Sequence, residues 1–311
     1  PSFFAPLDVR EPLKPGVLRE FATWVTPLVK STVPPPALFL GTPFERYDQT
    51  HLLDDVKDPE ELARRALLEA QRSQRDLVVV TNIQADDPRL EAWEAADFVV
   101  LPSFPDTIVS LDVDSFDGHL ARIAPADRSS VRRNTKRFIK AGHRLERLRD
   151  TDAHADALYR AYRPMFDRAT GKWLPHSRDY FARLGEFEEA LVTAALSDAD
   201  ELLGFVVAFD DGLTVQSGRI GITPAWHRKD AIYFRLMYHL VQDALQNRGR
   251  ELSLEPTAYR RKRHLGATPR PLINLVLGVS APWRALLSSL APLGRQLLNH
   301  LEDDEQLEES Y

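Results

Sequence analysis

The stretch AWHRKDAIYFRLMYHLVQDALQNRGRELSLEPT, residues 225–257, decides the fold of this 311-residue chain. It predicts a helix over residues 230–247 that Asp230 caps and that ends near Gly249, because apolar residues recur at helical spacing and glycine commonly follows a helix. The run RELSLEP then predicts a short strand over residues 250–256. A long helix leading into a strand indicates an α/β fold.

Further strands surround this stretch. The sequence predicts three before it, over residues 189–198, 201–212 and 213–223, and one after it, over residues 270–278. Asp211-Gly212 suits the turn of a hairpin, so neighbouring strands run antiparallel. The fold class is therefore predicted as α/β, more narrowly an α+β arrangement in which helices flank a mixed, mostly antiparallel sheet.

The first half of the chain shows a similar alternation of predicted helices and strands. Asp58 and Pro59 suit the start of a helix over residues 58–74, and DLVVVTN predicts a buried strand over residues 76–82. We therefore expect two lobes with flanking segments. The predicted divisions are an irregular N-terminal segment (1–36), an N-terminal lobe (37–124), a C-terminal lobe (125–280), and an amphipathic helix with an acidic tail (281–311).

A cationic stretch, RSSVRRNTKRFIKAG at residues 128–142, stands out in a chain of net charge −6. At 100° per residue its cations fall on one face of a helix, and Val131, Phe138 and Ile139 fall on the other. Ser129 or Ser130 can cap its start, and Gly142 can end it. A row of cations suits a polyanion, although such a face is also commonly a solvated surface.

Composition excludes several classes of protein. The chain has no cysteine, so disulfides and thiolate metal sites are excluded and a reducing compartment is favoured. We expect no metal site, because no histidines have zinc-ligand spacing, and no membrane span, because no apolar run approaches about 20 residues. The N-terminus lacks the layout of a signal peptide, so we expect a cytoplasmic protein. Motifs of hydrolases, dehydrogenases and kinases are missing.

Three pieces of sequence resemble the GNAT acyltransferase superfamily. They are SFDGHLARIAPADRSSVRRNTKRFIKAG, the opening stretch, and YRRKRHLGATPRPLINLV with Lys262 four residues before Gly266. Their order is similar to the tandem-GNAT branch that contains the Fem-type peptidoglycan aminoacyl-ligases and related predicted N-acyltransferases. The resemblance covers residues 37–278. It implies two GNAT-like lobes joined by a basic helical segment, of which the N-terminal lobe is catalytically degenerate.

The resemblance also implies where an activated donor binds. In GNAT enzymes the turn before the long helix holds the donor's pyrophosphate at the helix N-terminus. That turn is Pro224–Asp230 here, so the predicted donor-binding residues are Trp226, His227, Arg228 and Lys229, with Arg133 and Lys136 from the cationic stretch. The turn lacks the usual glycines. We therefore keep two donors, acyl-CoA and aminoacyl-tRNA, as co-substrates, with no tightly bound cofactor and with tRNA as a partner in the second case.

Catalytic candidates lie just after the long helix. Glu255, at the end of its strand, can accept a proton from an attacking ammonium, or can simply pair with Arg260 or Arg261. Lys262 occupies the spacing at which classical GNAT enzymes often carry a tyrosine acid; it can stabilise an oxyanion, or be a solvated lysine. Tyr259 is a candidate acid or positioning group, or a packing residue.

Candidate acceptor-binding residues lie elsewhere in the C-terminal lobe. Arg219, flanked by small residues in its strand, can hold a carboxylate or phosphate. Lys172 and Trp173, with His176 nearby, lie in a loop that can border the acceptor. The sequence thus predicts an N-acyltransferase in which an amine of a small-molecule or peptide-like acceptor attacks the donor carbonyl directly. The alternative is a non-catalytic nucleic-acid-binding or adaptor protein that uses residues 128–142.

Overall fold

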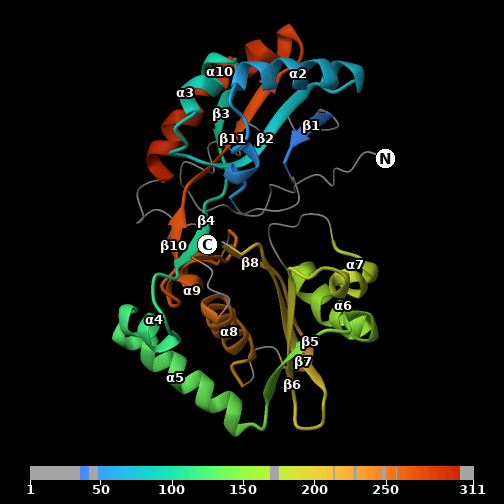
Figure 1. Ribbon diagram of the computed structural model, residues 1–311, viewed down its shortest axis with the longest axis vertical. Coiled ribbons are helices and arrows are strands. Elements are labelled where there is room, and N and C mark those ends of the chain that lie inside the picture. Colours follow the sequence, from blue (N-terminus) through green and yellow to red (C-terminus); the bar gives the residue numbers. More distant parts are fainter. Residues whose placement is uncertain are drawn as a thin grey trace. The chain divides into compact units, whose positions relative to one another are not determined.

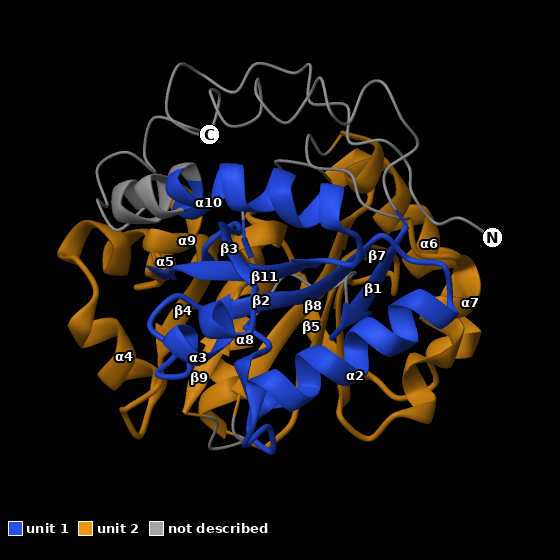
Figure 2. Ribbon diagram, turned by 90° about the horizontal axis from the view of Figure 1, so that it is seen from above, with its two compact units in different colours: residues 1–106, 256–259, 269–311 blue, residues 107–255, 260–268 orange. Residues whose placement is uncertain are grey.

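The computed structural model describes residues 36–41, 48–168, 175–212, 214–226, 230–246, 250–256 and 258–301. The chain forms two compact units (Figure 2). Unit 1 comprises residues 1–106, 256–259 and 269–311, and unit 2 comprises residues 107–255 and 260–268.

Unit 1 contains a mixed sheet with the strand order β1-β2-β11-β3. Strand β1 (Ala37–Leu40) is parallel to β2 (Leu77–Gln84). Strand β11 (Leu272–Gly278) lies between β2 and β3 (Val99–Pro102) and is antiparallel to both. Its largely apolar sequence fits this central position, because such a strand is covered on both faces.

Helices cover both faces of this first sheet (Figure 1). One face packs on α2 (Pro59–Arg72) and α3 (Leu90–Ala95), and the other on α10 (Ala281–Leu301). The N-cap predicted for α2 is confirmed, since the Asp58 carboxylate accepts a hydrogen bond from the Glu61 amide at 3.1 Å. A short 3-10 helix, η1, spans Thr50–Leu53.

A second sheet, carried mainly by unit 2, has the order β10-β4-β9-β8-β7-β6-β5 among the described residues. Its pairings are antiparallel at β4–β9, β5–β6, β6–β7 and β7–β8, and parallel at β8–β9. The sheet is thus mixed and mostly antiparallel, which confirms the predicted fold class. The strand bounds are β4 (Asp106–Ser110), β5 (Arg144–Leu148), β6 (Ala190–Leu196), β7 (Leu202–Asp210), β8 (Thr214–Ile222), β9 (Glu251–Ser253) and β10 (Thr268–Arg270).

Two groups of helices sandwich the second sheet (Figure 1). On one face, α6 (Thr151–Arg168) and α7 (Arg178–Arg183) build a core with β6 and β7. On the other, α8 (Ile232–Gln246) packs with α4 (Phe116–Arg122) and α5 (Pro125–Lys140). The remaining short helices are η2 (Leu184–Glu186), η3 (Pro224–Trp226) and α9 (Tyr259–Arg263).

Three local expectations need correction or refinement. The last strand, expected in the C-terminal lobe, is β11 of the first sheet, because its pairing partners lie far away in the sequence. Helix α5 begins at Pro125, which is favoured at the first helical position, so the two serines lie inside the helix. Gly142 follows its end with φ +77°, as expected of a terminating glycine, whereas Ile139 is 63% exposed instead of buried.

Candidate active site

The strands β8 and β9 separate from each other within the second sheet. Their parallel pairing runs from Thr214 with Glu251 to Gln216 with Ser253, but β8 continues to Ile222. Parallel strands that part in this way expose backbone and side chains along the edge of β8. Such an opening within a sheet is a natural place for a substrate.

An irregularity in β8 lies at the same level. Between Val206 and Ala208 of β7 the partner in β8 changes from Ile220 to Ser217, so β8 carries one extra residue there. A bulge of this kind bends a strand and re-aims its side chains. Val215 and Ile220 consequently both pack in the α8 core, although strict alternation along a strand would place them on opposite faces.

Arg219 lies within this bulge and joins two other candidate residues. Its Nη1 donates to both carboxylate oxygens of Glu255, at 3.1 and 3.3 Å, and its Nε donates to His176 Nε2 at 2.6 Å. The Arg219 and Glu255 side chains are 20% and 17% exposed. The three side chains form a polar cluster, in which Arg219 bridges the Glu255 carboxylate and the neutral acceptor nitrogen of His176. Because the ion pair is only partly buried, solvent and a ligand can still reach it.

Glu255 is held by its backbone as well as by its side chain. Its φ is +61°, an uncommon value for a residue with a Cβ. Two donors converge on its carbonyl oxygen, namely Lys262 Nζ at 2.6 Å and the hydroxyl of Thr107. Lys262 is 6% exposed, so its ammonium is a buried structural partner of the Glu255 carbonyl and not a solvated lysine. The strained conformation is maintained by these contacts.

His176 has an unusual environment. Burial, followed by the nearby charge of Arg219, lowers its pKa from 6.5 to about 4. The ring is therefore neutral at pH 7, and Nε2 is its acceptor nitrogen because Arg219 donates to it. Tyr180 stacks on the ring with centroids 4.0 Å apart, and the His176 amide donates to the Tyr162 hydroxyl at 3.3 Å. Burial raises the pKa of Tyr162.

Tyr259 and Lys262 share helix α9 but have different surroundings. Tyr259 is buried, and its hydroxyl donates to the Pro105 carbonyl at 2.8 Å, a contact within unit 1. Lys262 contacts Glu255 within unit 2. The structure therefore brings Arg219, Glu255 and Lys262 into one cluster, and it gives Tyr259 a hydrogen bond to a backbone carbonyl.

The predicted donor turn is partly described. Trp226 packs edge-on against His143, with ring centroids 5.3 Å apart. The Asp230 carboxylate lies 3.5 Å from Arg137 Nε and 3.4 Å from His143 Nε2, so it contacts the end of α5. Asp230 and Ala231 both have positive φ, and the helix itself begins one residue later. His227, Arg228 and Lys229 lie outside the described residues, as do Lys172 and Trp173 of the predicted acceptor loop.

The two cations proposed from the basic helix differ in their contacts. Arg133 donates to the Ser130 hydroxyl at 3.2 Å, whereas Lys136 lines a pocket between α4, α5 and α8. Within the described ranges, no group of three or more His, Cys, Asp or Glu residues could hold a metal ion. None of the described helices is both long and apolar enough to cross a membrane.

Sequence reasoning did not find several members of the cluster. Thr107 and Tyr162 come from β4 and α6, and nothing in their local sequence indicates a site. His176 was placed only in the acceptor loop, since its contact with Arg219 spans 43 residues. The sequence left Glu255 as either a proton acceptor or a partner of Arg260 or Arg261; in the structure its carboxylate pairs with Arg219. The charged residue among small residues in a strand, at Arg219, was one usable signal in the sequence.

Part of the chain matches a known protein family. Residues 126–263 match the family model described as an acetyltransferase (GNAT) domain. This part of the chain is therefore similar to a GNAT acetyltransferase domain. No curated protein sequence matches the chain.

Solved structures agree on the fold. FemX is 12% identical, with a TM-score of 0.58 over 82% of this chain and 84% of FemX. L-PGS from Bacillus licheniformis is 13% identical, with a TM-score of 0.51 over 76% of this chain and 78% of that one. The C-terminal domain (DUF2156) of a protein assigned as a lysylphosphatidylglycerol synthetase from Agrobacterium fabrum is 13% identical, with a TM-score of 0.51 over 76% of this chain and 79% of that one. At these identities the likeness establishes the fold.

Proposed function

We propose that the protein is an N-acyltransferase that moves an acyl or aminoacyl group onto an amine of a small-molecule or peptide-like acceptor. The observation that carries this proposal is the Arg219–Glu255 pair, with His176 on its third corner, where β8 and β9 separate. The GNAT domain match supports the reaction class.

In this proposal Glu255 is the proton acceptor. Acceptor amines are protonated at neutral pH, and an ammonium must lose a proton before its nitrogen can attack a carbonyl carbon. The Glu255 carboxylate can accept that proton directly or through one water. The free amine then attacks the donor carbonyl, the C–N bond forms, and the donor's thiolate or ribose oxygen leaves and takes up a proton. No covalent intermediate on the enzyme is needed.

Arg219 and Lys262 have positioning roles in this scheme. Arg219 fixes the carboxylate through two hydrogen bonds, and neutral His176 fixes the guanidinium in turn. Lys262 anchors the Glu255 carbonyl, which sets the direction of its side chain. Arg219 also remains the best candidate to bind an anionic group of the acceptor, because a guanidinium that is 20% exposed can still donate further hydrogen bonds.

The donor is proposed to be acyl-CoA or aminoacyl-tRNA, bound at the turn that contains Trp226. Asp230 lies in this turn, but Arg137 stands 3.5 Å from its carboxylate. The local charge is thus compensated, and an anionic donor does not meet an isolated carboxylate.

The proposal is tested with the purified full chain and a panel of amines. Thiol release from acetyl-CoA and transfer from labelled aminoacyl-tRNA are measured in parallel, with and without ribonuclease. We expect transfer with one donor, and ribonuclease sensitivity only for the tRNA. Glu255→Gln should lower kcat by roughly 10²- to 10⁴-fold, while the exposed Glu188→Gln should not change it.

Two outcomes would overturn the proposal. One is binding of nucleic acid through residues 128–142 with no transfer from either donor, which would favour the adaptor alternative. The other is a Glu255→Gln variant with the full kcat, which would remove Glu255 from the chemistry.

A further inference from the structure

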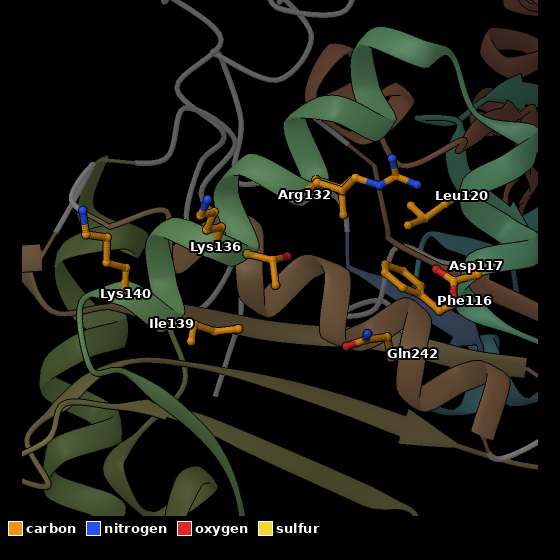
Figure 3. Close-up of a pocket in the computed structure, with 10 residues that line it drawn as sticks. Phe116, Asp117, Leu120, Arg132, Lys136, Ile139, Lys140 and Gln242 are labelled. Carbon is orange, nitrogen blue, oxygen red and sulfur yellow. The ribbon is translucent and has the colours of Figure 1, made fainter.

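A pocket of about 560 Å³ lies on the outer side of α8, away from the Arg219 cluster (Figure 3). Helix α4 contributes Phe116, Asp117 and Leu120, and α8 contributes Gln242. Helix α5 contributes Val131, Arg132, Thr135, Lys136, Ile139 and Lys140. Because α8 packs on the face of the second sheet opposite α6 and α7, this pocket is separate from the cluster that contains His176. Its volume falls in the range of small-molecule sites.

One side of the pocket is cationic. Arg132, Lys136 and Lys140 follow each other at intervals of four residues, so they form a row about 12 Å long on one side of α5. Within the described part of the chain, none of these three cations has an ion-pair partner. Their charge is therefore available to an anion from outside, unlike that of Arg137, which lies beside Asp230.

The rest of the pocket is largely apolar. Leu120 and Val131 are buried and form its floor, and Phe116 is half-buried. Ile139 is 63% exposed between two of the cations. The apolar surface of an exposed aliphatic side chain is unfavourable in water. When a ligand covers that surface, its burial contributes to the binding free energy. The surface thus combines a cationic rim with an apolar floor.

The distribution of charge also gives the pocket a direction. Figure 3 shows Asp117, Phe116 and Leu120 toward one end and Lys140 and Lys136 toward the other. An anionic group is disfavoured beside the Asp117 carboxylate and favoured between two ammonium groups one helical turn apart. An apolar body attached to that anion can extend over Val131 toward Phe116.

We propose that this pocket binds an amphipathic small molecule, with a phosphate or carboxylate between Lys136 and Lys140 and an apolar body over the α4 end. This activity is additional to acyl transfer and does not depend on the donor or acceptor of that reaction. The pocket's limited volume favours a single small molecule over a membrane or a nucleic acid.

Calorimetric titration of the full chain with monomeric decyl phosphate tests the proposal. Inorganic phosphate has the anionic group without the apolar body, and decanol has the apolar body without the anion. Each should bind at least tenfold more weakly than decyl phosphate. The double variant Lys136→Gln/Lys140→Gln should weaken decyl phosphate binding by roughly tenfold, since it removes two charged hydrogen-bond donors. Ile139→Gln should weaken it by roughly threefold.

Arg133→Gln is the matched control. It removes one charge from the same helix outside the pocket, so decyl phosphate binding should stay within about twofold. Circular dichroism confirms that each variant is folded. Equal weakening by Arg133→Gln and by either lysine substitution alone would overturn the proposal, because only general charge would then matter. So would binding to phosphatidylglycerol vesicles or to a single-stranded oligonucleotide without binding of monomeric decyl phosphate.

Discussion

Replacing His176 with glutamine should change how the stability of the protein depends on pH. The pKa of His176 in the folded protein is about 4, below its ordinary value of 6.5, first because the ring is buried and then because Arg219 lies beside it. As the pH falls below 6.5 the unfolded chain therefore binds a proton that the folded chain does not. The wild-type protein loses stability from pH 6.5 down to about pH 4 through this group.

The size of the effect follows from the two pKa values. Before any screening by solvent, the difference between 6.5 and about 4 corresponds to about 3–4 kcal/mol. Solvent reaches part of the ring and screens it, so we expect about 1–2 kcal/mol between pH 7 and pH 4.5. Glutamine offers an oxygen to Arg219 Nε where the histidine offers Nε2, but it does not titrate.

The assay is urea unfolding of both proteins at pH 7 and pH 4.5. Between pH 7 and pH 4.5, the free energy of unfolding of the wild type should fall by about 1–2 kcal/mol more than that of His176→Gln. His119 and His239, whose pKa values are also lowered by burial, remain in both proteins and cancel in the comparison. In a companion NMR titration, Arg219→Met should raise the pKa of His176 but leave it below 6.5, since burial persists.

The reasoning would be refuted by two results. One is the same loss of stability in both proteins. The other is a His176 pKa near 6.5 in the wild type, because then neither burial nor Arg219 would be acting on the ring.

Two further predictions concern the scaffold of the site. Gly221→Ala should lower the free energy of unfolding by about 2–3 kcal/mol in urea denaturation, since a Cβ would come within 2.2 Å of Phe205 Cε1 and 2.9 Å of the Ala161 carbonyl carbon. An unchanged unfolding midpoint would contradict this packing. Lys262→Met should lower the free energy of unfolding by about 1–3 kcal/mol and reduce acyl transfer, because the Glu255 carbonyl loses a buried hydrogen-bond donor. Wild-type stability of that variant would show that the contact is dispensable.

Features encoded by neighbouring residues were predictable from the sequence. The N-cap of α2 depends on Asp58 and a residue three positions later, and the helical period of α8 is visible within its own sequence. The hairpin turn between β7 and β8 depends on Asp211 and Gly212. Each of these signals acts over a few residues, so one sequence carries it completely.

Features that depend on distant residues were not predictable. The local sequence of β11 predicts an apolar strand but does not say to which sheet it belongs. Only its pairing with residues almost two hundred positions earlier places it in the first sheet. The bulge in β8 has no clear sequence mark beyond its glycines, yet it decides which side chains share a face. Arg219, Glu255 and His176 were each candidates, but their sequence separations hid that they form one cluster.

The basic helix shows how one sequence feature can serve separate purposes. Its cations look equivalent in the sequence, but their partners differ. Arg137 lies beside the carboxylate of Asp230, which compensates an acid at the proposed donor turn. Lys136 and Lys140 instead face a pocket with an apolar floor. The acid in the turn therefore does not by itself argue against an anionic donor, and the remaining positive charge of α5 is directed at a different ligand.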